Sequence, residues 1–118
     1  MNRLINFQAL KAVYLICGKT DLRKGIDGLA AIVHEQFDLD PFQPELFLFC
    51  GNRRDRFKAL YHESDGFILL YKRVDHGRLQ WPNEPEELLK LNQKQLGDLL
   101  NGLSVVSTIK PAEAGYFY

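Results

Sequence analysis

Short apolar runs and turn-forming residues predict the elements in the first half of the chain. The apolar run at residues 12 to 17 predicts a strand that is buried on both faces. Apolar positions at helical spacing then predict a first turn near Asp21 and a main helix from Asp27 to Phe37. A second apolar strand is expected at Glu45 to Cys50. Strand, helix and strand within about forty residues predict a crossover unit with two parallel strands.

The next segment carries the pattern of a β-hairpin. Strands are expected at Phe57 to Glu63 and at Phe67 to Val74, joined by Ser64-Asp65-Gly66, which contains an Asp-Gly turn signal. Alternation gives the hairpin a mostly apolar face with Phe57, Ala59, Tyr61, Ile68, Leu70, Lys72 and Val74. The other face mixes cations, aromatics and aliphatics, namely Lys58, Leu60, His62, Phe67, Leu69, Tyr71 and Arg73. Such a face suits phosphates and bases, although cross-strand packing and edge protection use the same residues.

The C-terminal part is predicted to be mainly helical. A short edge strand is expected at Leu79 to Trp81, followed by helical segments at Glu86 to Leu91 and Gln93 to Leu100. Asn92 and Gln95 have the spacing of a capping box that opens the second helical segment.

Together these elements predict an α+β fold. We expect a mixed sheet of four to five strands, built from a β-α-β crossover and an antiparallel hairpin, with one crossover helix and C-terminal helices. A single domain is expected at residues 1–103, and residues 104–118 are expected to form a loose or partner-docking tail with one short strand at Val105 to Ile109.

Composition places the chain among ordinary globular proteins, since 46% of its 118 residues are hydrophobic and 25% are charged. No secretory signal and no apolar run of membrane-spanning length is present in the sequence, so a cytoplasmic location is expected. Thiols are reduced there, and Cys17 and Cys50 are expected to be free. The sequence has no CxxC pair, so we expect no metal and no other cofactor.

Charge is balanced over the whole chain but not along it. The sequence has 15 basic and 15 acidic residues. Residues 51 to 82, however, hold seven basic and four acidic residues, a local excess of three positive charges. Arginines of the Arg53-Arg54-Asp55-Arg56 turn can reach phosphate oxygens, while the alternative is a turn that is simply solvated.

The pattern does not favour an enzyme. Metal-dependent DNA cleavage or strand transfer needs clustered carboxylates, commonly with one in the middle of a buried strand. None of the predicted strands has an acidic residue in its middle. Gly18-Lys19-Thr20 matches the end of a phosphate-binding loop, but Val13 stands where that motif has its first glycine.

Five motifs that follow one another along the chain are together more specific to one protein family than any single motif. They are Val13 to Leu15 with Cys17-Gly18, Thr20 to Ala30, Asn52 to Lys58, Asp65 to Phe67 with Tyr71 to Arg73, and Gly77 to Pro82. In these motifs the chain resembles the TnpB accessory protein, the second open reading frame product, of insertion-sequence-66-type elements, over residues 10 to 103. Lys19 departs from an expected proline, and His62 from a frequent tryptophan.

The resemblance implies a bacterial accessory protein that takes part in DNA transposition beside a separate, larger transposase. It implies no established catalytic activity, so no catalytic residues are carried over. Its motifs coincide with the basic loop and the hairpin, which supply the nucleic-acid-binding candidates Arg53, Arg54, Arg56, Lys58, Tyr71, Lys72, Arg73, Arg78 and Trp81. Arg23 and Lys24 form a second candidate cluster at the start of the helix.

Two functions follow from these observations. The protein either binds DNA, at the ends of the element or at its target, through the basic loop and hairpin, or binds the transposase as a protein-interaction module without contacting DNA. The second is motivated by the zero net charge and by the aromatic tail Tyr116-Phe117-Tyr118. Neither function needs a membrane or a small-molecule substrate.

Overall fold

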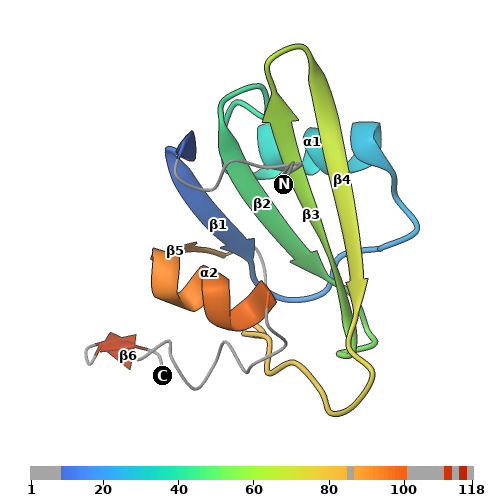
Figure 1. The fold of residues 1–118 in the computed structure, drawn as a ribbon, viewed down its shortest axis with the longest axis vertical. Coiled ribbons are helices and arrows are strands. Elements are labelled where there is room, and N and C mark those ends of the chain that lie inside the picture. Colours follow the sequence, from blue (N-terminus) through green and yellow to red (C-terminus); the bar gives the residue numbers. More distant parts are fainter. Residues whose placement is uncertain (1–8, 85–86, 101–110, 113–114, 117–118) are drawn as a thin grey trace, which may run out of the picture.

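The computed structural model describes residues 9–84, 87–100, 111–112 and 115–116. Its centre is a five-stranded sheet of order β4-β3-β2-β1-β5, with α1 behind the sheet and α2 in front of it in Figure 1. This arrangement confirms the predicted α+β class. The elements are β1 (Ala12–Ile16), α1 (Ile26–Phe37), β2 (Glu45–Cys50), β3 (Arg56–Glu63), β4 (Gly66–Arg73), β5 (Leu88–Leu91), α2 (Gln93–Leu100), and the separate pair β6 (Pro111–Ala112) and β7 (Gly115–Tyr116).

The predicted crossover unit is confirmed. β1 and β2 pair in parallel, with Val13 opposite Leu46, and α1 connects them. On one face of the sheet the buried Leu29 and Val33 of α1 belong to the same apolar cluster as Phe47. Both faces of β2 are buried, which explains why its sequence is a continuous apolar run.

The predicted hairpin is also confirmed, with a different turn. β3 and β4 pair from Arg56 opposite Arg73 to Glu63 opposite Gly66. Gly66 therefore belongs to the strand, and the turn consists of Ser64 and Asp65, with Ser64 at a φ of 53°. The register places odd residues of β3 and even residues of β4 on one face, as alternation predicts.

The predicted helix at Glu86 to Leu91 is wrong. Leu88–Leu91 is the strand β5, which pairs antiparallel with β1, with Val13 opposite Leu91. Helix propensity of leucine, glutamate and lysine is a weak preference, whereas the outer edge of the buried β1 needs partners for its backbone groups. Pairing with β1 therefore decides the conformation of this segment.

The predicted edge strand at Leu79 to Trp81 is wrong as well. Leu79 and Trp81 are only 3% and 4% exposed, and both pack in the core cluster that also holds α2. The indole Nε1 of Trp81 donates a hydrogen bond of 2.8 Å to the carbonyl of Ile16. The segment thus crosses a sheet face, because its two large apolar side chains gain more from burial there than at an edge.

The capping box that opens α2 is confirmed. Asn92 N–H donates to Gln95 Oε1 at 2.9 Å, and Gln95 N–H donates to Asn92 Oδ1 at 2.8 Å. The buried Leu96 and Leu99 pack α2 against the sheet. The predicted strand at Val105 to Ile109 lies outside the described residues, so the tail stays a prediction.

Cys17, directly after β1, and Cys50, the last residue of β2, are buried, free thiols in one core cluster, and free thiols were expected. Burial raises the pKa of Cys17 to about 12, and nearby Glu84 and Glu87 add to this effect. No helix in the described part of the chain is long and apolar enough to cross a membrane.

We expect Trp81→Phe to lower the free energy of unfolding by about 2 kcal/mol, because it leaves the buried Ile16 carbonyl without its donor and removes part of a packed ring. Urea unfolding followed by circular dichroism measures this change. Tryptophan fluorescence cannot be used, because Trp81 is the only tryptophan and the variant lacks it. As a control, Tyr71→Phe at an exposed position should change stability by less than about 0.5 kcal/mol. Equal stability of the Trp81 variant and the wild type would contradict the role of this hydrogen bond.

Candidate nucleic-acid groove

Two loops meet where β1 and β2 end. Since the two strands are parallel, the loops that follow them lie at the same edge of the sheet, the place where open α/β sheets hold ligands. Thr20 N–H donates to the Cys50 carbonyl at 2.8 Å and ties the loops together. A Cβ on Gly51 would lie 3.2 Å from both Leu22 Cγ and Thr20 O, so glycine allows this close approach.

The two loops and Tyr71 of β4 line an open groove of about 720 Å³. Four of its ten lining residues are basic and one is acidic. The basic residues are Lys19 and Arg23 from the first loop, Arg53 from the second loop, and Arg56 at the start of β3. The groove therefore gathers positive charge on a protein whose formal net charge is zero.

The acidic residue, Asp21, is tied to Arg23. Arg23 donates to Asp21 from its backbone N–H at 3.0 Å, from Nε at 2.9 Å and from Nη2 at 3.0 Å. These hydrogen bonds lower the pKa of Asp21 to about 2, so the carboxylate stays charged near neutral pH. Both residues are exposed, and an exposed ion pair of this kind contributes little stability. A phosphate can therefore replace the carboxylate at the Arg23 guanidinium.

Arg56 is held between two partners. It donates to the Asp55 carboxylate from Nε at 2.9 Å and from Nη2 at 3.2 Å, and to Tyr71 Oη from Nη1 at 3.3 Å. The hydrogen bonds with Asp55, followed by that with Tyr71, raise the pKa of Arg56, so it stays charged. Its guanidinium therefore fixes the hydroxyl end of the Tyr71 ring.

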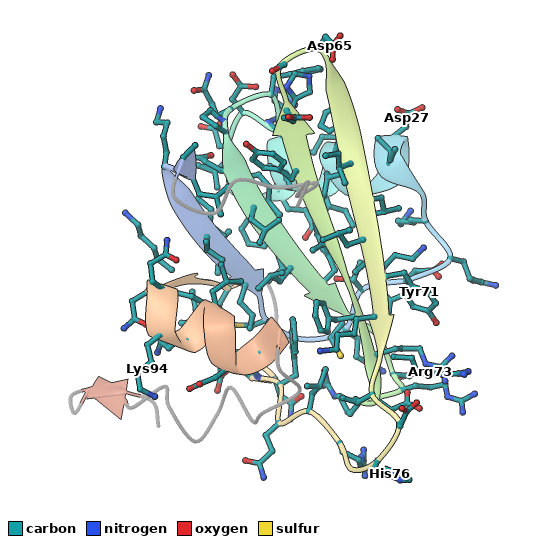
Figure 2. All side chains as sticks on the ribbon, viewed as in Figure 1. Asp27, Asp65, Tyr71, Arg73, His76 and Lys94 are labelled. Carbon is teal, nitrogen blue, oxygen red and sulfur yellow. The ribbon has the colours of Figure 1, made fainter. Side chains whose placement is uncertain are left out.

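Lys58 holds the same ring from another side. Its Nζ donates to the Lys24 carbonyl at 3.1 Å and lies 5.7 Å from the centroid of the Tyr71 ring, within the range of a cation–π contact. Figure 2 shows Tyr71 and Arg73 near the end of β4 that is remote from Asp65. Lys58, Tyr71 and Arg73 lie on one face of the hairpin, as predicted.

The mixed face of the hairpin, predicted to suit phosphates and bases, is not open along its whole length. Leu60, Phe67 and Leu69 pack with Leu29 and Val33 of α1, so the helix covers the middle of this face. The accessible parts are the end around Tyr71 and the opposite end around Phe67.

Several predicted binding residues lie elsewhere. Trp81 is buried, so the expectation that its ring is available to a ligand is wrong. Lys72 pairs with Phe57 on the opposite hairpin face, and it has an interaction partner of its own. Arg54 is half-buried and donates from Nη2 to Asn83 Oδ1. Arg78 is exposed but does not line the groove.

Arg53 and Arg56 from the first candidate cluster and Arg23 from the second meet in the groove. Lys24 does not line it but accepts the hydrogen bond from Lys58. Sequence reasoning missed Lys19, which is exposed and lines the groove. Its position directly after a strand predicted to be parallel was the available signal.

A second surface lies at the other end of the hairpin. Phe42 is 61% exposed, and its ring centroid is 5.1 Å from that of His62 and 5.2 Å from that of Phe67. Phe42 also lines a neighbouring groove whose acidic residues are Asp27, Asp38 and Asp40, and this groove has no lysine or arginine among its described lining residues. No three His, Cys, Asp or Glu side chains gather as a metal site would require in the part of the chain that the structure describes.

Comparison with known proteins identifies the family. Residues 11–110 match the family described as IS66 Orf2 like protein. The uncharacterized protein y4hO of Sinorhizobium fredii is 34% identical over 91 residues, 77% of this chain and 79% of the relative. The uncharacterized protein y4jC of the same organism is 30% identical over 83 residues, 70% of this chain and 71% of the relative. No solved structure matches the chain. The chain therefore belongs to the IS66 Orf2 like protein family, which its sequence motifs resemble.

Proposed function

We propose that this protein is a non-catalytic accessory factor of DNA transposition that binds DNA, at the ends of the element or at its target, through the basic groove. Membership in a family of insertion-sequence accessory proteins supplies the biological setting. The observation that carries the proposal is that three exposed cations, Lys19, Arg23 and Arg53, come from two loops and line one groove. Phosphate oxygens are the ligands that such cations favour.

The number of phosphate contacts in the groove sets the expected salt dependence of DNA binding. Three phosphate contacts give a slope of about −2.7 in the logarithm of the binding constant against the logarithm of the salt concentration. Raising salt from 50 to 200 mM should therefore weaken binding roughly 40-fold. The zero net charge adds no long-range attraction, so binding depends on the groove itself.

We expect the double variant Arg23→Ala/Arg53→Ala to lose two of three phosphate contacts, so that the same change in salt weakens binding only about threefold to fourfold. Fluorescence anisotropy with labelled element ends and with random duplex measures both slopes. Lys90→Ala/Lys94→Ala removes the same charge on β5 and α2, outside the groove, and should keep the wild-type slope. An unchanged slope in the arginine variant would rule out the groove as the DNA site.

The absence of catalysis is also testable. Supercoiled plasmid incubated with the protein and magnesium or manganese should stay supercoiled, because two-metal DNA cleavage needs clustered carboxylates. Agarose gel electrophoresis detects nicks. Nicked circles that increase with protein concentration and disappear with a chelator would overturn the non-catalytic assignment.

A second candidate function is docking of the element's transposase, and the Phe42 surface favours it. The exposed Phe42 ring, which contacts the half-buried His62 and Phe67 beside an acidic groove, matches a partner segment that carries an apolar side chain among basic residues. Phe67 and Tyr71 are four residues apart on β4, roughly 13 Å along the strand, so one hairpin can serve DNA at one end and protein at the other.

If this docking occurs, Phe42→Ser should reduce co-purification of the two full-length proteins at least tenfold, because exposed aromatic anchors dominate such interfaces. The turn should persist, since the bond from Phe42 N–H to Asp40 Oδ1 involves only the backbone of Phe42. Lys90→Ala/Lys94→Ala should co-purify normally. Wild-type recovery of the transposase by the Phe42 variant would exclude this surface.

A further inference from the structure

Tyr71 is an unusual surface residue for this chain. Among the described residues only Phe42 and Tyr71 are large hydrophobic side chains counted as exposed, and Tyr71 is 55% exposed. It is the aromatic ring in the lining of the basic groove. Burial therefore does not account for a large flat ring at this position, and its chemical surroundings are informative.

Cations from two positions hold the ring. Arg56 binds Tyr71 Oη, and Lys58 lies over the ring, while Asp55 and the Lys24 carbonyl hold these two cations in turn. The Tyr71 ring is thus held by partners from three segments, namely the second loop, β3 and the segment before α1. A ring that is fixed before binding loses little conformational entropy when a ligand stacks on it.

The ligand class follows from the combination of a fixed aromatic ring and a cationic groove. Base stacking on aromatic rings together with phosphate contacts along a positive groove is the chemistry of single-strand binding. In a duplex each base is covered by its neighbours, so an exposed ring at the groove wall cannot stack on it without unstacking it.

We propose that the groove prefers an unpaired DNA segment, with one base stacked on Tyr71 and the adjacent phosphates on Arg23 and Arg53. This inference rests on the proposed DNA-binding function and adds the form of the DNA. Tyr71 is then the residue that discriminates unpaired from paired DNA. Arg23 and Arg53 bind both forms of DNA through the phosphates of the DNA backbone. Arg56 and Lys58 act as positioning residues for the ring.

The test compares a twelve-nucleotide single strand with the same sequence in a closed hairpin duplex by fluorescence anisotropy. The wild type should bind the single strand at least tenfold more tightly. Tyr71→Ala and Tyr71→Leu should weaken single-strand binding roughly 10- to 100-fold, the effect of one lost stacked base, and should change duplex binding less than twofold. Tyr71→Phe, which keeps the ring but loses the bond from Arg56, should bind the single strand with an affinity between those of the wild type and Tyr71→Leu.

Two readouts separate stacking from other effects. The salt slope should stay the same in Tyr71→Ala, because the phosphate contacts remain. A 2-aminopurine base in the strand should be quenched by the wild type and by Tyr71→Phe, but not by Tyr71→Leu. Circular dichroism confirms that each variant is folded.

The outcomes distinguish this inference from the proposed function. Equal wild-type affinity for both DNA forms, or unchanged single-strand binding in Tyr71→Ala and Tyr71→Leu, would overturn the inference while leaving DNA binding intact. An equal loss on both DNA forms in the folded Tyr71 variants would also overturn it. No binding of either DNA form by the wild type would overturn both proposals.

Discussion

Parallel pairing of β1 with β2 is the constraint on which the rest of the structure depends. Because the strands run in the same direction, the loops that follow them emerge at one edge, and the bond from Thr20 N–H to the Cys50 carbonyl joins them. Antiparallel pairing would send the two loops to opposite edges and separate Arg23 from Arg53. The crossover through α1 is the topological consequence, since parallel strands need a connection that returns across the sheet.

Local pattern predicted the elements whose apolar periodicity is clear. The two buried strands, the hairpin and α1 all follow from runs, alternation and helical spacing bounded by turn residues. The helix predicted over residues 88 to 91 is wrong because Leu-Leu-Lys-Leu fits a helix by propensity. Only pairing with the free edge of β1, more than seventy residues away in the sequence, makes this segment a strand. The edge strand predicted at Leu79 to Trp81 is wrong for a related reason, because the burial of Leu79 and Trp81 depends on α2 and β1, which are distant in the sequence.

The site was predictable only in part. The local positive excess pointed to the segment that holds Arg53 and Arg56, both of which line the groove, and alternation correctly put Lys58 and Tyr71 on one face. Sequence alone does not say that α1 covers the middle of that face or that Arg54 points toward Asn83. It also does not place Lys19 in the same groove as Arg53, because strand pairing across more than thirty residues brings their loops together.

Two carboxylates near the groove have different consequences for its cations. The Asp21–Arg23 pair has side chains that are 42% and 92% exposed, so water screens it and a phosphate can displace the carboxylate at little cost. The Asp55–Arg56 pair has side chains that are only 30% and 20% exposed, and its geometry is therefore more persistent. Arg23 is thus suited to contact a ligand, whereas Arg56 is suited to hold Tyr71 still. The acidic residues order the cations of the groove without cancelling their positive excess.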